Sequence, residues 1–469
     1  MNRQNFPKHL LLAVTIIMLA AMAGQIRRWQ RDYQPRRSRT VLTTTTTTIP
    51  KRTQALEVLV RFRPGTTLDR IRAIALRQND RIEDRIESVN NLVVMEDADG
   101  ADMDEIIRGY SNLPDVEYVE PNYTISLDPE PQGTEPPSYL DSAENGPNDP
   151  MFGDQWSLEN SGQRGGRAKA DISALAAWDK TKGSDKVVVA VLDSGVDYTH
   201  PDLIKNMWVR PPNMARYTDD QIGTVDDAHG FNAIDDTGDP MDDNGHGTHC
   251  AGIIGAEGDN GTGIAGVNWK VEIMPLKFMN ANGSGTTKDA IKAINYVIER
   301  KRAGVNVRVI NASWGSTAKS KALEDAIREA GDEGILFIAA SGNSSADADR
   351  SPHYPSGYQL PNVISVAALN RNDELASFSN YGAKTVHIAA PGAEILSTWL
   401  GGAFEEHSGT SMATPEVVGV AALVLSLEPD MSVKELRQRL MDSTDPLPAL
   451  KGKVVTGGRI NAARAVGAK

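Results

Sequence analysis

Four polar residues stand at positions where their side chains could together perform acyl transfer. Asp193 directly follows an apolar run, 187–192, and His246 lies between two glycines at the start of an apolar segment. Asn343 ends a small-residue turn, and Ser411 stands where another such turn runs into an apolar stretch. A serine can attack a carbonyl, a histidine can take and return its proton, an aspartate can hold the imidazole tautomer, and an asparagine can stabilise the oxyanion.

Each of these residues taken alone has a plainer interpretation. Ser411 would more often be a helix cap, and Asp193 and Asn343 would be ordinary turn residues. The order Asp, His, Ser along the chain is that of subtilisin and differs from the orders of chymotrypsin and the α/β-hydrolases. Ala413 also breaks the G-x-S-x-G frame of the α/β-hydrolases. The combination favours a serine hydrolase.

The surrounding sequence predicts the elements that would position these residues. From residue 148 onward, short apolar runs alternate with amphipathic segments, which predicts an α/β fold with a mostly parallel sheet covered on both faces. Sites in such folds form beyond the carboxyl ends of the strands. The predicted strands are 186–192, 272–277, 307–310, 335–339 and 363–366, and the predicted helices include 288–300 and 321–330.

The motifs D-S-G, H-G-T-H-C-A-G, A-S-G-N and G-T-S-M-A-T-P occur in this order and resemble the active-site blocks of subtilisin-like serine proteases, the subtilase family. The resemblance covers about residues 148–469. It implies a subtilisin-like three-layer sandwich and a serine endopeptidase that acts on proteins and peptides. It also implies a catalytic triad of Asp193, His246 and Ser411, with Asn343 stabilising the oxyanion.

The resemblance extends to substrate binding, where the family holds an extended peptide between two backbone segments, as in β-augmentation. His353 is similarly placed near the floor of the S1 pocket, and a bulky floor predicts smaller P1 residues. The residues that would contact substrate are Gly283, Ser284 and Gly285 on one side, Ser313, Trp314 and Gly315 on the other, and Ala340, Ser341 and Gly342 at the S1 wall.

The segment 257–264 resembles the calcium loop of the family. Carboxylate, amide and carbonyl oxygens suit Ca²⁺, so the resemblance implies a structural calcium ion. The implied ligands are the side chains of Asp149, Asp202 and Asn260 and the carbonyls of Gly258, Thr262 and Ile264. Five aspartates also crowd the stretch 235–243, which is either a solvated acidic loop or a second ion site.

A competing interpretation makes His246 and His249 a zinc pair. It lacks a third ligand at suitable spacing, and no glutamate stands between the histidines. Cys250 is the single cysteine, so no intramolecular disulfide is expected. A third alternative, a catalytically silent peptide-binding relative, would need a broken triad or oxyanion position, and the sequence contains all four residues.

Residues 55–126 predict a small α+β domain. Strands are expected at 56–63, 91–96 and 116–125, with helices at 68–77 and 103–110. The resemblance implies that this domain is a propeptide, which assists folding and inhibits the enzyme by laying its C-terminal tail in the cleft; an unrelated spacer domain is the alternative. Residues 127–147 form a linker rich in proline and acids that would contain the processing site.

The first 54 residues look like a targeting segment followed by a linker. Residues 1–24 have the charged start, apolar run and A-x-A ending of a signal peptide, and 25–54 are basic and threonine-rich. The arginines after the apolar run resist translocation, so an uncleaved membrane anchor stays open beside secretion. Residues 1–54 carry ten Lys/Arg and one acid, about +9, so the net charge of −13 leaves the remainder near −22, which argues against nucleic acid as a partner.

The stretch that carries Ser411 departs from the family at Glu416, where relatives commonly have a histidine after the proline. An unpaired buried glutamate is energetically costly. We therefore expect the Glu416 carboxyl to be hydrogen-bonded or solvated.

Overall fold

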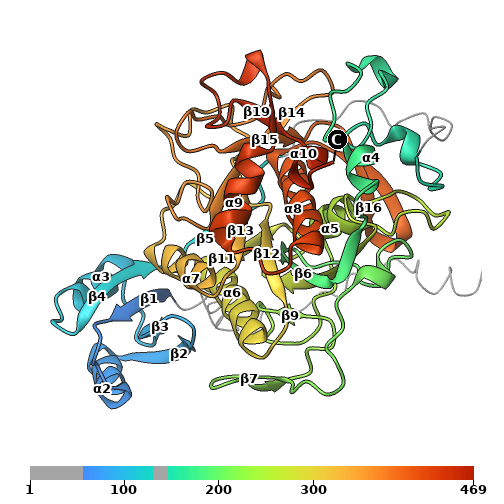
Figure 1. Cartoon of the computed structure of the whole chain (residues 1–469). Coiled ribbons are helices and arrows are strands. Elements are labelled where there is room, and N and C mark those ends of the chain that lie inside the picture. The colour runs from blue at the N-terminus through green and yellow to red at the C-terminus, as the bar shows by residue number, and fades with distance from the viewer. Residues whose placement is uncertain (1–55, 130–145, 469) are drawn as a thin grey trace, which may run out of the picture. The chain divides into compact units, whose positions relative to one another are not determined.

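The computed structural model describes residues 56–129 and 146–468 (Figure 1). The expected signal peptide or anchor, the basic linker and most of the linker 127–147 lie outside the described residues.

A nine-stranded sheet forms the middle layer of the large domain, in the order β18-β19-β15-β14-β13-β12-β6-β10-β9. All neighbouring strands are parallel except the pair β18 and β19. This confirms the mostly parallel sheet. The strands are β6 (Gly183–Asp193), β9 (Phe231–Asn232), β10 (Lys270–Lys277), β12 (Val307–Ala312), β13 (Leu336–Ala340), β14 (Val363–Leu369), β15 (Ile388–Pro391), β18 (Thr444–Pro446) and β19 (Gly458–Ile460).

Helices cover both faces of this sheet because its strands are apolar on both sides. In β6, Val189 and Val191 point into one core cluster, and Ala190 and Leu192 point into the other. The first cluster contains residues of α4 (Ala174–Trp178), α5 (His246–Gly255), α8 (Thr410–Leu427), α9 (Val433–Asp442) and α10 (Ala462–Ala465). The second contains residues of α6 (Thr287–Arg302) and α7 (Lys321–Asp332). The three-layer α/β architecture is thus confirmed.

Helix α8 is the central core helix of the large domain. Among the described helices it is the one long and apolar enough to cross a membrane, but 89% of its apolar window is buried inside the structure. A helix that is apolar all round is expected at such a position. Its apolar character therefore reflects packing on the sheet.

The small N-terminal domain is a four-stranded antiparallel sheet, in the order β2-β3-β1-β4, with two helices. The sequence prediction missed β2, because five of its seven residues are charged and hide the apolar alternation. The elements are β1 (Glu57–Phe62), α2 (Leu68–Gln78), β2 (Asp80–Ile86), β3 (Leu92–Asp97), α3 (Met103–Ser111) and β4 (Val116–Pro121).

The small domain contacts α6 and α7 of the large domain. Apolar residues of its sheet, such as Leu59 and Val94, belong to the same core cluster as both helices. The carboxylate of Glu120 accepts hydrogen bonds from the backbone N–H groups of Lys321 (2.7 Å) and Ala322 (3.1 Å) at the start of α7. A carboxylate is favoured at a helix N-terminus by the unpaired N–H groups there.

Short strand pairs lie outside the two main sheets. One of them joins the two domains, since β5 (Thr124–Ser126) pairs with β11 (Ser284–Thr286). The others are β7 (Tyr217–Asp219) with β8 (Gly223–Val225), and β16 (Ile395–Trp399) with β17 (Ala403–His407).

Candidate active site

The four predicted catalytic residues lie at the carboxyl edge of the large sheet. Asp193 is the last residue of β6, and Asn343 follows the end of β13 by three residues. His246 opens α5, and Ser411 is the second residue of α8. The topology therefore brings the first turns of two helices to the ends of two central strands.

Asp193 and His246 form a buried hydrogen-bonded pair. The Nδ1 atom of His246 lies 2.8 Å from Oδ1 of Asp193, and the backbone N–H of Ser194 donates to the same oxygen at 2.8 Å. Asp193 is fully buried and His246 is 4% exposed. Because a carboxylate only accepts, Nδ1 carries the hydrogen and Nε2 is left as the basic ring atom.

The glycine after His246 allows this close pairing. A Cβ atom at Gly247 would lie 2.0 Å from the carbonyl oxygen of Gly195 and 3.1 Å from Cβ of Asp193. A side chain at position 247 would thus push α5 away from the end of β6.

Ser411 is fastened to the residue that follows β12. Its hydroxyl donates to the carbonyl of Ser313 at 2.9 Å, and the Ser313 hydroxyl donates to the carbonyl of Ser411 at 2.8 Å. Pro415 explains the second bond, because it lacks the N–H that would otherwise bond the Ser411 carbonyl within the helix. The Sγ atom of Cys250, one turn after His246 on α5, lies 3.6 Å from the same carbonyl, so the starts of α5 and α8 are adjacent.

Asn343 presents a fixed amide beside Ser411. The backbone N–H and the hydroxyl of Thr410 both donate to its Oδ1 atom at 2.9 Å. This orients the Nδ2 group, which lies 3.2 Å from the position of a Cβ atom at Gly409. A preorganised N–H donor next to a serine hydroxyl is the arrangement that stabilises an oxyanion.

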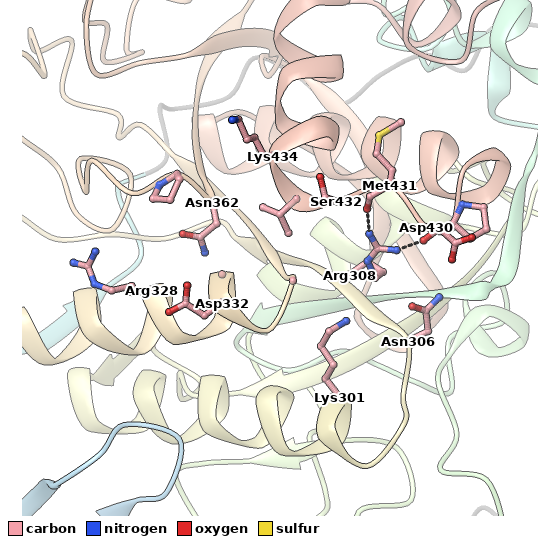
Figure 2. A pocket seen from close by; sticks show the side chains of 15 residues that line it. Lys301, Asn306, Arg308, Arg328, Asp332, Asn362, Asp430, Met431, Ser432 and Lys434 are labelled. Carbon is pink, nitrogen blue, oxygen red and sulfur yellow. Dashed lines mark hydrogen bonds between the residues drawn. The ribbon is translucent and has the colours of Figure 1, made fainter.

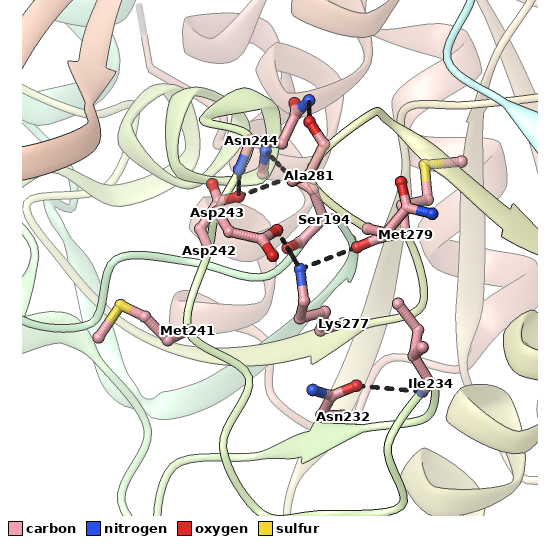
Figure 3. Close-up of polar contacts among 12 residues, drawn as sticks. Ser194, Asn232, Ile234, Met241, Asp242, Asp243, Asn244, Lys277, Met279 and Ala281 are labelled. Carbon is pink, nitrogen blue, oxygen red and sulfur yellow. Dashed lines mark hydrogen bonds and ion pairs between the residues drawn. The ribbon is translucent and has the colours of Figure 1, made fainter. Parts of the chain in front are cut away.

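Two polar residues that sequence reasoning did not single out as site residues support the pair (Figure 3). The carboxylate of Asp242 accepts hydrogen bonds from the Ser194 hydroxyl (2.9 Å), the Gly245 N–H (3.0 Å) and the Thr248 hydroxyl (2.6 Å). It thereby builds the turn before His246. An aspartate before Asn-Gly is a turn signal that could have pointed to this role.

Lys277 ends β10 and is buried. Its Nζ atom donates to the carbonyls of Ser194 (2.8 Å) and Met279 (2.9 Å) and pairs with the Asp243 carboxylate (Figure 3). It therefore holds the chain just after Asp193. A lysine at the end of an apolar strand gives no sequence signal of this role.

The five aspartates before His246 do not converge on one point, which argues against a second ion. Asp235 accepts from Asn232, Asp236 pairs with Lys292, Asp239 accepts from the Tyr198 hydroxyl, and Asp243 pairs with Lys277. The Asp242 oxygens are taken by the hydrogen bonds described above.

The zinc interpretation is not favoured by the position of His249. Its Nε2 atom lies 3.1 Å from the Glu405 carbonyl oxygen, and its ring packs edge-on against His407. Burial lowers the pKa of His249 well below its usual value. Among the described residues, Asp193, His246 and Cys250 bring ligand atoms within 4.8 Å of one another, and His249 is not in this group.

The predicted calcium loop brings two buried carboxylates together. The Asp202 carboxylate accepts from the Asn260 side chain (2.8 Å) and the Ile264 N–H (2.9 Å). The Asp149 carboxylate accepts from the N–H groups of the same loop at Asp259 and Asn260. Burial raises the pKa of Asp202 to about 7, and Asp149 and Glu257 add to the effect. Two neighbouring buried carboxylates suit a Ca²⁺ ion, so Asp149 and Asp202 fit the ion. The Asn260 amide here turns its nitrogen to Asp202 and its oxygen to the Thr262 N–H.

A strand of the chain itself lies between the two predicted substrate segments. In the β5–β11 pair, Ile125 is opposite Gly285, and on its other side Ser126 bridges Gly315. The Leu127 N–H donates to the Gly283 carbonyl at 2.9 Å. The residues 283–285 and 315 thus contact an extended peptide, whereas the Trp314 ring is fully buried in the core.

The S1-wall segment 340–342 also lies at this edge. The Gly342 N–H donates to the Thr410 hydroxyl at 3.1 Å, next to Ser411, and the Ser341 hydroxyl donates to the Asn380 carbonyl at 3.3 Å. Ala340, the last residue of β13, is fully buried.

The expectation for Glu416 was wrong. Its side chain is fully buried on α8, and neither carboxyl oxygen has a hydrogen bond of normal geometry. Burial raises the pKa of Glu416 to about 8, and the nearby Ser157 hydroxyl only partly offsets this. The protonated form avoids most of the desolvation penalty, which is how an unpaired glutamate can occupy the core.

A pocket of about 710 Å³ lies elsewhere, lined by Lys301, Asn306, Arg308 and Asp430 among others (Figure 2). Asn306 precedes β12, so this pocket is at the amino edge of the sheet, opposite the predicted catalytic residues. The guanidinium of Arg308 already donates to the carbonyls of Pro429 and Met431.

Comparison with known proteins gives the family of both domains. Residues 184–467 match the subtilase family, and residues 56–122 match the fervidolysin N-terminal prodomain. The chain is 35% identical over 418 residues to a thermophilic serine proteinase of a Bacillus species, covering 87% of each protein. It is 35% identical over 320 residues to thermitase of Thermoactinomyces vulgaris, covering 68% of this chain and 99% of thermitase.

Solved structures agree on the fold. Fervidolysin from Fervidobacterium pennivorans, described as a keratinolytic enzyme related to subtilisin, matches with a TM-score of 0.67 at 23% identity, covering 88% of this chain and 61% of that one. A protease from Pseudoalteromonas arctica matches with a TM-score of 0.56 at 29% identity, covering 69% of this chain and 99% of that one.

Proposed function

This chain belongs to the subtilase family and is a subtilisin-like serine endopeptidase with an N-terminal prodomain, and we propose that it is secreted and matures by cutting itself. Ser411 attacks the substrate carbonyl, and His246 takes the serine proton and returns it to the leaving amine. Asp193 holds the imidazole, and the Nδ2 group of Asn343 stabilises the oxyanion. Water then releases the acyl group from Ser411, again with His246 as the base.

The observation that carries this proposal is the buried 2.8 Å contact between His246 Nδ1 and Asp193 Oδ1 at the strand end where Ser411 begins α8. It supports a base with a defined tautomer beside a helix-terminal serine. The serine hydroxyl now donates to Ser313, and catalytic hydrogen bonds often align only once substrate is bound.

Self-processing is supported by the chain segment paired with β11, which lies where a substrate would lie. We place the maturation cut within residues 127–147, after which the prodomain acts as an inhibitor in the cleft. The charged and apolar start of the chain supports export, with retention as a membrane anchor as the alternative outcome.

A structural Ca²⁺ ion held by the loop 257–264 completes the proposal. Asp149, Asp202 and Asn260 would bind it through side-chain oxygens, and Gly258, Thr262 and Ile264 through carbonyls. The ion would neutralise the buried carboxylates and stabilise the loop.

The test compares wild type with the Ser411→Ala protein. We expect wild type to hydrolyse casein, to lose its prodomain in isolation and to be inactivated by a fluorophosphonate, while the Ser411→Ala protein stays full-length and inactive. If both proteins hydrolyse casein and both lose the prodomain, the mechanism is wrong. Loss of activity on removal of zinc would favour a zinc hydrolase instead.

A further inference from the structure

The tail of the prodomain continues past β5 to the nucleophile. Ser126 is opposite Gly315 in antiparallel register, so the register places Asp128 opposite Ser313 two residues further along. The Ser313 carbonyl accepts the Ser411 hydroxyl. Asp128 therefore occupies the P1 position, that of the residue whose carbonyl the serine attacks.

His353 lines the space that receives the P1 side chain. A Cβ atom at Gly315 would lie 2.1 Å from its Cε1 atom, and a Cβ atom at Gly342 would lie 3.1 Å from its Cδ2 atom. The imidazole thus lies between the two segments that form the walls of this pocket, and it is only 6% exposed. Glycine at both positions leaves room for the ring.

The Asp128 carboxyl group points at this imidazole. Its Oδ1 atom lies 3.2 Å from Nε2 of His353, and the aspartate side chain is only 14% exposed. A carboxylate only accepts, so Nε2 donates. An apolar P1 side chain would leave this buried N–H without a partner, which costs more than the hydrogen bond itself contributes.

We propose that His353 makes the S1 pocket select an acidic P1 side chain, aspartate foremost, so that the protease cuts proteins after acidic residues. The proposal rests on the proposed function of Ser411 and its partners. It replaces the expectation that a bulky floor favours small P1 residues, because the histidine acts as a hydrogen-bond donor to the P1 side chain. The tail of the prodomain shows the preferred side chain in place.

Pro129 distinguishes the tail from a substrate. It makes the bond after Asp128 a tertiary amide and fixes the chain direction beyond the nucleophile. Test peptides therefore carry the sequence Thr-Ile-Ser-Leu-Xaa-Ser-Ala, which keeps the tail residues but places serine after the variable P1 residue.

The experiment expresses the full-length chain, lets it mature, and measures kcat/KM of the mature enzyme on these peptides with aspartate, asparagine, glutamate or leucine at P1. Active enzyme is counted by fluorophosphonate labelling. A site built to bond one polar group rejects analogues lacking it strongly, so we expect at least about a tenfold preference for aspartate over leucine. Asparagine keeps an oxygen that can accept from Nε2 of His353, so it should be cut at a rate between the two. In the His353→Leu protein the preference for aspartate over leucine should disappear.

Two further variants keep the test decisive. His229, which stacks on Tyr198, gives a matched control, and the His229→Leu protein should keep the preference for aspartate. The His353→Gln protein retains an N–H donor and should keep part of it. Mapping of the casein bonds cut by wild type needs no variant and should show cuts mainly after aspartate and glutamate.

The outcomes separate the two proposals. If wild type hydrolyses casein but does not prefer acidic P1 residues, or if the His353→Leu protein keeps the preference, the inference is wrong and the protease mechanism stands. If no fluorophosphonate labels Ser411 and casein is not cut, the proposed function itself fails.

Discussion

Two buried carboxyl groups of the large domain, those of Asp193 and Glu416, differ in how many hydrogen bonds they accept: Asp193 accepts two at Oδ1 and none of normal geometry at Oδ2. Asp193 accepts hydrogen bonds from the Ser194 N–H and from His246 Nδ1. Glu416 lies on α8, which packs on the same sheet, and neither of its oxygens has a partner of normal geometry. Burial raises the pKa of Glu416 to about 8.

The comparison shows that donors act beside burial and do not replace it: Asp202 accepts two hydrogen bonds, yet burial still raises its pKa to about 7. At Asp193 the Ser194 N–H and the His246 imidazole both bond the same carboxyl oxygen, so this carboxyl can orient the imidazole. Where no donor of normal geometry reaches the carboxyl, as at Glu416, the group takes a proton and remains as a source of instability at high pH. The predictions below remove or add partners at such buried acids, from the largest expected effect to the smallest.

Removing the charge of Asp193 should have the largest effect. In the Asp193→Asn protein the amide can donate to His246, which favours the wrong tautomer, and kcat should fall about 10⁴-fold. The measurement is kcat on the aspartyl peptide, with active enzyme counted separately. The exposed Asp179 gives the control, and the Asp179→Asn protein should stay within about twofold of wild type. A fall in kcat of less than about tenfold for Asp193→Asn would contradict the proposed role of Asp193 in holding the imidazole.

Glu416 should make stability fall as the pH rises. The folded protein keeps this group protonated up to about pH 8, whereas an unfolded chain ionises it near pH 4.3. Between these values the folded state binds the extra proton, so the free energy of unfolding decreases with pH and levels off above about pH 8. The total loss should be about 3 to 5 kcal/mol.

The measurement uses the Ser411→Ala background, which prevents self-digestion. Denaturant unfolding between pH 5 and 9 should show the Glu416→Gln protein gaining on its parent as the pH rises. The exposed Glu428, the C-cap of the same helix, is the control, and Glu428→Gln should not produce this trend. A constant difference between the Glu416→Gln protein and its parent would mean that the carboxyl has an unseen partner.

Calcium should act as the missing partner of Asp202. At 100 times its Kd the ion should stabilise the fold by about 2.7 kcal/mol, measured as a rise in Tm over a chelated sample. The effect of Asp202→Asn on stability should change sign between the two conditions. The variant should be at least as stable as its parent in chelator at pH 8 and less stable than its parent in calcium. The Asp239→Asn protein serves as the control in the other acidic stretch. If Asp202→Asn changes stability by the same amount in calcium and in chelator, Asp202 is not a calcium ligand.

The smallest effect is expected at Glu120, a buried acid with three donors, the Ser320 hydroxyl and the N–H groups of Lys321 and Ala322. Glu120→Ala should lower the stability of the unprocessed Ser411→Ala protein by about 1 kcal/mol, as for loss of a helix cap. The half-exposed Glu117 gives the control. If Glu117→Ala lowers the stability as much as Glu120→Ala does, the hydrogen bonds of Glu120 to the start of α7 make no specific contribution.

Local patterns were enough to predict the fold class and to single out the proposed catalytic residues. Asp193, His246 and Ser411 each stand where a periodic apolar segment begins or ends, and such boundaries are visible in the sequence. The mostly parallel sheet and the three layers follow from alternating strands and helices, whereas the strand order was not predicted. Strand β2 was not predicted because its charged sequence has no strand pattern of its own, and pairing with its neighbour is what makes it a strand.

Long-range partners could not be predicted in this way. His353 and Asp128 are 225 residues apart, and nothing near either residue indicates the other. Lys277 and Glu416 present the same problem, since a lysine ending a strand and a glutamate in a helix are ordinary in a sequence. Their roles depend on the hydrogen-bond partners that the folded chain brings to them. Lys277 finds several acceptors, and Glu416 finds no donor of normal geometry.

The proline in α8 has a consequence for heat inactivation. Helix ends commonly loosen before the rest of a protein unfolds. Because Pro415 leaves the Ser411 carbonyl to Ser313, Ser411, the proposed nucleophile, is hydrogen-bonded to the end of β12, an interior strand of the large sheet. Loosening at the start of α8 would therefore leave the serine in place, and the enzyme should keep its activity on heating until the sheet itself melts.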